Sequence, residues 1–402
     1  MEYLVQGGDV LIVSIIVLFL GAFLTGKIPF LKKYSIPDAV TGGLICSIIV
    51  ALIFALTDFK ITFDTRLRDI LLLVFFSTIG LSAKLRLLAA GGKALVILVV
   101  AATIFLVIQD VTGVLLVTAL GAHPGYGLFG GSVSFAGGYG TAIAWGDVAE
   151  EAGLRNAKEI GIACATFGLI AGGILGGPIA ERLIRRNQLR GPASHEAAET
   201  IPKDEDDSRR LNLNEILGSL LLLAACVELG DLVNRFLFSR GTTLPGFLTA
   251  MFVGIVLTNS ADLLKLKVSQ LAIDRCGELT LPLFLAMSLM SMQLWTLAQA
   301  LGPILLILLA QITVMTLFAV FIVFRVMGRD YDASVIAAGF VGLGLGATPV
   351  GIANMDAVTR KYGPSAKAFL VIPLVGAFFI DIANAAVIKF FLASPIISQI
   401  SP

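Results

Sequence analysis

Long apolar runs alternate with short polar segments along almost the whole chain. Each run has about 18 residues or more, which is enough for a helix to cross a bilayer. In the first half the runs fall near 9–26, 36–57, 70–88, 94–113 and 158–180. In the second half they fall near 213–236, 244–261, 279–297, 302–325 and 367–390. The pattern therefore predicts an all-α polytopic membrane protein with ten spans.

Two further apolar segments, 124–149 and 332–358, carry a glycine cluster at their centre. The first contains SFAGGYGTA and the second contains GLGLGATPV. Each half of such a segment has about a dozen residues, and about 18 Å of helix reaches only the middle of a bilayer. We therefore expect each to be a re-entrant hairpin, which enters the membrane, turns at the glycines and leaves on the same side.

Lysines and arginines orient the chain, because the cytoplasmic loops of membrane proteins hold an excess of them. With the N-terminus outside and ten crossings, the cytoplasmic segments contain 21 of the 29 basic residues and the outer segments contain 8. Both termini are therefore expected to be periplasmic. The charged, proline-containing stretch 185–210 is expected to be a flexible cytoplasmic linker.

The two halves of the chain match as repeats when the second is moved back by about 208 residues. The expected domains are a first repeat over 1–184, the linker and a second repeat over 211–402. Five crossings are an odd number, so the second repeat is inverted, as in many secondary transporters. Residues that match at offsets of 208 or 206 include Pro37 with Pro245, Gly168 with Gly376, Gly138 with Gly344 and Gly140 with Gly346.

The two hairpins enter from opposite sides, so their tips are expected to meet at mid-membrane. Thr141 and Thr348 are expected to cap the returning helices, with Pro349 at the first helical position. Two helix N-termini would then favour an anion at one place. The alternative is that these glycines only allow tight packing, as we expect for those at 42–44 and 173–178. Packing alone does not explain their recurrence at matching places.

An anionic substrate needs a counter-charge, and no lysine or arginine lies near the middle of a predicted span. A co-transported cation can supply it. Asp381 and Asn384 lie three residues apart and share a helix face. A carboxylate inside a membrane indicates function, and Na⁺ binds carboxylate, amide and unwound backbone oxygens. Asp381 could instead bind the amino group of an amino-acid substrate, or only tie helices together.

Other polar residues in the apolar segments are weaker candidates. Ser132, Ser134 and Asn354 lie in the hairpins and could contact a substrate. Four polar residues close to the ends of the fourth and sixth spans are expected at the membrane interface: Gln109, Asp110, Glu228 and Asp231.

Composition narrows the classes of function. The chain is 57% hydrophobic and 14% charged, with a mean hydropathy of +0.93 and a net charge of +1, so nucleic acid is not an expected partner. Four scattered cysteines and two histidines without an HExxH motif do not indicate a metal centre. No catalytic pair or cofactor fingerprint favours a membrane enzyme. A channel of the aquaporin type would carry Asn-Pro-Ala at both tips, and this sequence has none.

Several long motifs resemble those of the bacterial sodium/glutamate symporters, which are related to the citrate carriers. They are KKYSIPDAVTGGL, RDILLLVFFSTIGLSAKL, the GGYGT tip, CATFGLIAGGILGGP, GLGLGATPVGIANM and IPLVGAFFIDIANA. The resemblance covers nearly the whole chain. It implies a sodium-coupled L-glutamate importer of the bacterial inner membrane, working as a homodimer whose transport part moves like an elevator against a scaffold. Family members often have His where this chain has Tyr139.

Motifs and resemblance together give one predicted site around the two tips. L-glutamate is the expected substrate and Na⁺ the expected coupling ion, with no organic cofactor; citrate, malate or aspartate are alternative substrates. The Na⁺ ligands are expected to be Asp381, Asn384, Gly138 and Gly344. The expected substrate contacts are Ser132, Ser134, Gly137, Gly138, Tyr139, Gly140, Thr141, Gly344, Gly346, Ala347, Thr348, Asn354 and Asp381.

Overall fold

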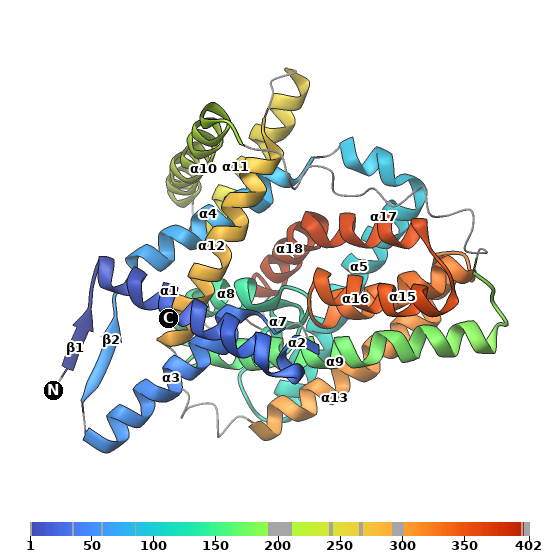
Figure 1. Cartoon of the computed structure of the whole chain (residues 1–402), viewed down its shortest axis with the longest axis horizontal. Coiled ribbons are helices and arrows are strands. Elements are labelled where there is room, and N and C mark those ends of the chain that lie inside the picture. The colour runs from blue at the N-terminus through green and yellow to red at the C-terminus, as the bar shows by residue number, and fades with distance from the viewer. Residues whose placement is uncertain are drawn as a thin grey trace. The chain divides into compact units, whose positions relative to one another are not determined.

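The computed structural model of the chain is almost entirely helical (Figure 1). It describes residues 2–33, 36–57, 59–84, 86–191, 211–240, 244–264, 268–291, 301–394 and 397. Within this part, seven helices are long and apolar enough to cross a membrane. They are Gly8–Lys27, Asp38–Thr57, Gly92–Ala119, Ala157–Arg186, Leu213–Ser239, Gly246–Leu263 and Gly302–Val326. The chain is therefore an all-helical polytopic membrane protein, as the sequence predicts.

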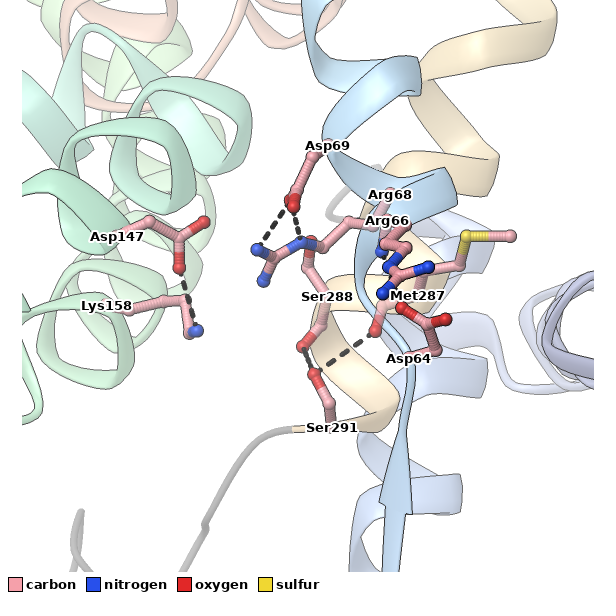
Figure 2. Close-up of polar contacts among 9 residues, drawn as sticks. All are labelled: Asp64, Arg66, Arg68, Asp69, Asp147, Lys158, Met287, Ser288 and Ser291. Atoms are coloured by element: carbon pink, nitrogen blue, oxygen red, sulfur yellow. Dashed lines mark hydrogen bonds and ion pairs between the residues drawn. The ribbon is translucent and has the colours of Figure 1, made fainter. Parts of the chain in front are cut away.

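The three remaining predicted spans coincide with helices that are shorter, more polar or interrupted. Helix α4 (Arg66–Ser82) has 17 residues and begins with charged side chains, among them Arg68, whose guanidinium bonds to Asp69 Oδ1 (Figure 2). Helix α12 (Gln270–Met290) carries three charged residues in its first half. The predicted span 367–390 is divided by a π-helical stretch, Val375–Phe379. The count of ten spans stays a prediction.

The helices form two compact units, and each unit takes elements from both halves of the sequence. The elements of the first unit are β1 (Glu2–Val5), α1 (Gly8–Lys27), α2 (Pro29–Lys33), α3 (Asp38–Thr57), β2 (Lys60–Phe63), α4, α10 (Leu213–Ser239), α11 (Gly246–Leu263) and α12. In this unit α4 packs against α11 and α12, and α1 packs against α3.

Strands β1 and β2 pair in parallel, with Glu2 opposite Lys60 and Val5 opposite Phe63. The sequence pattern predicts no strand here. Each strand has only four residues, which is too short for an alternating pattern to stand out beside a long apolar helix.

Close helix contacts in the first unit depend on glycine. A Cβ on Gly42 would lie 2.0 Å from Val17 O, and one on Gly80 would lie 2.1 Å from Met251 O. Only glycine fits at such crossings, because a Cβ at this distance would overlap the carbonyl oxygen. The packing role expected for the glycines at 42–44 is confirmed at Gly42.

The second unit contains the two glycine-broken segments and the helices around them. Figure 1 labels α15 and α16, which pack against each other and against α9. The elements of the second unit are α5 (Arg86–Ala119), α6 (Tyr126–Phe129), α7 (Ser132–Phe135), α8 (Gly138–Glu151), α9 (Ala157–Arg186), α13 (Leu301–Phe318), η2 (Ala319–Val323), α14 (Phe324–Val326), α15 (Tyr331–Leu345), α16 (Thr348–Tyr362), α17 (Ala366–Leu374), η3 (Val375–Phe379) and α18 (Ile380–Leu392). Of the predicted linker 185–210, residues 192–210 lie outside the described residues.

Three phenylalanines form the core between α5, α13 and α15. The ring centroid of Phe105 lies 5.0 Å from that of Phe318 and 5.6 Å from that of Phe340. A Cβ on Gly344 would lie 2.4 Å from Met315 Cε and 3.2 Å from the Phe105 ring. The end of α15 therefore lies directly against this aromatic core.

Helix α9 packs against both broken segments. A Cβ on Gly168 would lie 2.3 Å from Leu345 O, at the end of α15, and 2.5 Å from the ring of Phe135 in α7. Gly168 is thus the point of α9 where a backbone carbonyl of one segment and an aromatic side chain of the other both come close. Gly177, on the same helix, has nothing within 4 Å of such a Cβ.

Replacing Gly168 by Ala should destabilise the protein, because the new methyl overlaps the Leu345 carbonyl. Overpacking of this kind costs about 1–3 kcal/mol. The measurement is the apparent Tm of purified protein in detergent. Gly177→Ala is the matched control and should leave the Tm unchanged or raise it slightly. Equal Tm values for the two variants would show that α9 does not need the close approach at Gly168.

Candidate functional site

The second glycine-rich segment breaks at Gly346 and Ala347. Gly346 has φ −147° and ψ −91°, and Ala347 is fully extended, so α15 stops and α16 starts at Thr348. The Gly342 carbonyl accepts the Ala347 N–H at 2.9 Å, and this bond closes the end of α15. Residues from 333 to 346 are buried, whereas Ala347 and Thr348 are half-buried. The tip is therefore the open part of an otherwise buried segment.

The first glycine-rich segment breaks twice rather than once. Gly130 and Gly131 separate α6 from α7, and Ala136 and Gly137 separate α7 from α8. Gly138 has φ +67°, a left-handed conformation that glycine adopts without the strain a side chain would cause. Gly137 and Gly138 are half-buried while Ser132 to Phe135 are buried.

The predicted caps are displaced. Helix α8 begins at Gly138 with Gly137 before it, so Thr141 lies inside the helix and cannot be its N-cap. The helix therefore starts four residues earlier than the sequence predicts, with its N-cap at Gly137 instead of Thr141, next to the left-handed Gly138. Helix α16 begins at Thr348 itself, and Ala347 takes the N-cap position without a side-chain bond. Pro349 follows in the first turn, as expected for a helix start.

The two tips lie next to each other. A Cβ on Gly138 would have Gly346 O at 3.7 Å as its nearest atom. Both tips belong to the second unit. The starts of α8 and α16, with their unpaired first N–H groups, therefore lie close to one place.

Two glutamines bond to the backbone that the breaks expose. Gln109 Nε2 of α5 donates to Gly344 O at 2.8 Å. Gln311 Nε2 of α13 donates to Gly130 O at 2.8 Å and to Gln109 O at 2.8 Å. Each break is thus tied to a long helix. The side-chain oxygens of both glutamines are buried and have no hydrogen-bond partner among the described residues.

Three more polar side chains bond to backbone carbonyls near the breaks. Asn384 Nδ2 of α18 donates to Ser132 O at 3.1 Å. The Thr348 hydroxyl donates to Gly376 O at 3.0 Å, and Asn354 Nδ2 donates to Gly172 O at 3.0 Å. The Thr348 hydroxyl therefore binds a neighbouring helix instead of capping its own. Asn354 ties α16 to α9.

Gln109 and Asp110 are fully buried, so their predicted place at the membrane interface is wrong. Helix α5 continues to Ala119, six residues beyond the predicted end of the span, which moves both side chains from the edge to the interior. The Asp110 carboxylate accepts the Ser132 N–H at 2.7 Å and the Ser132 hydroxyl at 3.0 Å. Glu228 and Asp231 of the first unit are exposed.

Asp381 is half-buried in α18 and has no hydrogen-bond or ion-pair partner among the residues that the structure describes. Asn384 follows three residues later, is buried, and keeps an unpartnered side-chain oxygen. The two residues that the sequence singles out on this helix therefore both present free oxygens.

Comparison with known proteins gives the family. The family model described as sodium/glutamate symporter matches residues 5–364. The sodium/glutamate symporter of Escherichia coli (strain K12) is 41% identical over 389 residues, which cover 96% of this chain and 97% of that protein. The one from Haemophilus influenzae is 41% identical over 394 residues, with 97% and 98% covered. The chain belongs to the sodium/glutamate symporter family.

This confirms the resemblance that the sequence motifs indicate, and the relatives are named as symporters rather than enzymes. Among solved structures, the sodium/proton antiporter of Methanocaldococcus jannaschii matches 97% of this chain and 99% of its own. Its identity is 16% and the TM-score is 0.41, a likeness too low to support any conclusion.

In this symporter family member Tyr139 is buried and its hydroxyl donates to Thr166 Oγ1 of α9 at 3.1 Å. The ring thus links the start of α8 to α9. Ser134, in α7, is also buried, and its hydroxyl has no partner within the described ranges. A Cβ on Gly161 of α9 would lie 3.3 Å from that hydroxyl.

Helix α9 holds the two returning helices at its opposite ends. Near its start, Lys158 Nζ lies 3.0 Å from Asp147 Oδ1 of α8 (Figure 2). Near its end, Glu181 Oε1 accepts from Lys361 Nζ at 2.7 Å and from the Tyr362 hydroxyl at 3.0 Å, both at the end of α16. The positions of α8 and α16 therefore both depend on α9.

Replacing Gln109 by Leu should lower the apparent Tm in detergent, because the buried Gly344 carbonyl loses its donor. An unsatisfied buried carbonyl costs about 1–3 kcal/mol. The control is Thr118→Val on the same helix, where the hydroxyl donates only to Val114 O one turn before. A Gln109→Leu variant as stable as this control would show that the bond to Gly344 O does not stabilise the break between α15 and α16.

Proposed function

We propose that the chain imports L-glutamate together with Na⁺ across the bacterial inner membrane by alternating access. The main support for the proposal is that the two broken segments lie in one unit, with the starts of α8 and α16 beside each other. The substrate and the ion follow from the family, whose members are named sodium/glutamate symporters.

The substrate carboxylates would bind at the starts of α8 and α16. The first N–H groups of a helix have no partner within it, and the helix dipole adds a partial positive charge. The half-buried tip residues Gly137, Gly138, Ala347 and Thr348 leave these groups accessible within an otherwise buried region. The hydroxyl of Ser134 is a further donor without a partner.

Sodium would offset the negative charge of the substrate. Within the described residues Asp381 supplies a carboxylate without a partner, and Asn384 supplies an amide oxygen without a donor while its nitrogen bonds to Ser132 O. The carbonyls of Gly138 and Gly344 would complete the ligand set. Gly344 O accepts from Gln109 and has a second lone pair for the ion.

The repeat architecture is part of the proposal. The two inverted repeats would each supply spans to both units, and the two segments would be re-entrant hairpins from opposite sides. The division into units supports this, because each unit takes elements from both halves and the second holds both broken segments. The second unit would then move as the elevator against the first, in a homodimer with periplasmic termini and a cytoplasmic linker.

The test is uptake of labelled L-glutamate into proteoliposomes under an inward Na⁺ gradient, compared with an equal K⁺ gradient. Accumulation above equilibrium only with Na⁺ is expected. Unlabelled glutamate should abolish it, whereas citrate, malate and aspartate at the same concentration should compete weakly. Stronger competition by one of these acids would reassign the substrate, and uptake that does not depend on Na⁺ would reject the proposal.

Replacing Asp381 by Ala should abolish Na⁺-driven uptake and leave expression and detergent stability intact, because the side chain makes no bond that the fold needs. Asp356→Ala is the matched control: this carboxylate lies in α16 and pairs with Arg360 at an exposed site, where a single ion pair contributes little. Normal Na⁺ dependence in the Asp381 variant would exclude it from the ion site.

A further inference from the structure

Besides Asp381, a second acidic residue of the unit that holds both broken segments is a candidate for ion binding. Asp110 is fully buried in α5, and the predicted site does not include it. Both its oxygens accept bonds from one residue, Ser132: the N–H at 2.7 Å and the hydroxyl at 3.0 Å. Within the described residues no lysine, arginine or histidine pairs with it.

The N–H and hydroxyl of Ser132 are neutral donors, and they do not balance the negative charge of an ionised Asp110. An ionised carboxylate buried without a counter-charge is strongly unfavourable, and two hydrogen bonds offset only part of the cost. In a membrane protein such a group marks an ion or proton pathway by default. Asp110 therefore binds either a cation or a proton.

The surroundings favour a cation, because a residue that bonds to Ser132 carries a buried oxygen without a donor. Asn384 Nδ2 bonds to Ser132 O at 3.1 Å, so the Asn384 amide lies beside the residue that holds Asp110. Its side-chain oxygen is buried and accepts no hydrogen bond from the part of the chain that the structure describes. A buried amide oxygen without a donor is costly, and a cation at this place would satisfy it.

The backbone of the first segment is shaped to approach Asp110. A Cβ on Gly131 would lie 2.5 Å from Asp110 Oδ1, so only glycine allows this approach. The cluster joins three elements: α5 through Asp110, the start of α7 through Ser132, and α18 through Asn384. An ion bound here would fix the base of the first broken segment.

We propose that Asp110, Ser132 and Asn384 form a sodium site at the base of the first broken segment, with Asp110 supplying the charge. The site rests on the proposed sodium-coupled function, and it adds the carboxylate of Asp110 to the ion ligands proposed above, with which it shares the Asn384 oxygen. Sodium at Asp110 would order the α7–α8 tip, so that the start of α8 is positioned before the substrate binds. This ordering is a physical route by which Na⁺ raises the affinity for substrate.

The test compares Asp110→Asn with wild type. The amide keeps the shape and can still bond to the Ser132 N–H and hydroxyl, so the fold should be retained while the charge is lost. The Na⁺ concentration for half-maximal glutamate uptake should rise about tenfold or more. Asp356→Asn is the matched control for the same chemical change at an exposed carboxylate, and it should match wild type.

A second readout does not need transport. The apparent Tm of purified protein without glutamate is measured over a range of NaCl, at constant ionic strength with KCl, since a ligand that binds the native state stabilises it. Sodium should stabilise wild type and Asp356→Asn, and this stabilisation should need about tenfold more Na⁺ in Asp110→Asn. If wild type shows no Na⁺-driven uptake, the proposed transport fails, and this second readout still decides whether the site exists.

An Asp110→Asn variant with wild-type sodium dependence in both readouts would overturn the proposal, because Asp110 would then be a protonated structural group. If Asp110→Asn cannot be purified, Ser132→Ala replaces it. That variant loses the hydroxyl ligand and keeps the N–H bond to Asp110, so a several-fold higher half-maximal Na⁺ concentration is expected. An unchanged value in Ser132→Ala would also overturn the site.

Discussion

The structure depends on one constraint: a helix that breaks inside a membrane protein exposes backbone groups that water cannot reach. Each unsatisfied carbonyl or N–H there is costly. Side chains of the surrounding helices meet part of this need in both segments. Gln109 bonds to Gly344 O, Gln311 to Gly130 O and Asn384 to Ser132 O. Such irregular backbone is kept in membrane proteins where it is buried or lines a cavity.

The same constraint organises the second unit. Helix α9 approaches both segments closely through Gly168 and holds both returning helices at its ends through Lys158 and Glu181. The tips are then left half-buried beside each other. In our proposal these tips bind the substrate carboxylates, and Asp381 and Asp110 bring in the sodium that offsets them. The bonds that stabilise the breaks and the oxygens that would bind the ions come from the same side chains, as Asn384 illustrates.

The apolar runs and the glycine clusters were enough to predict a helical membrane protein and to locate the tip of each broken segment, but not the additional break at Gly130 and Gly131. They could not locate helix ends to better than a few residues, and this misplaced Gln109 and Asp110 at the interface. The displaced caps have a related cause: the left-handed Gly138 starts α8 before Thr141. The bonds from Gln109 to Gly344 and from Gln311 to Gly130 join residues 235 and 181 positions apart. No local spacing predicts such partners, because only the packing of the unit brings them together.

The most direct test is whether the two tips are in contact in the membrane. Gly138 and Gly346 are replaced by Cys in a background without the four native cysteines, and a protease site is inserted between the two halves within 192–203. Because Gly138 is left-handed, the apparent Tm of each variant is first compared with that of the background to establish that it keeps the fold. We predict that oxidation in native membranes joins the halves, so that they run as one band after proteolysis until the disulfide is reduced. Each single-cysteine variant should give two separate bands. Separate halves in the double variant, with both thiols still reactive after denaturation, would contradict the meeting of the two tips.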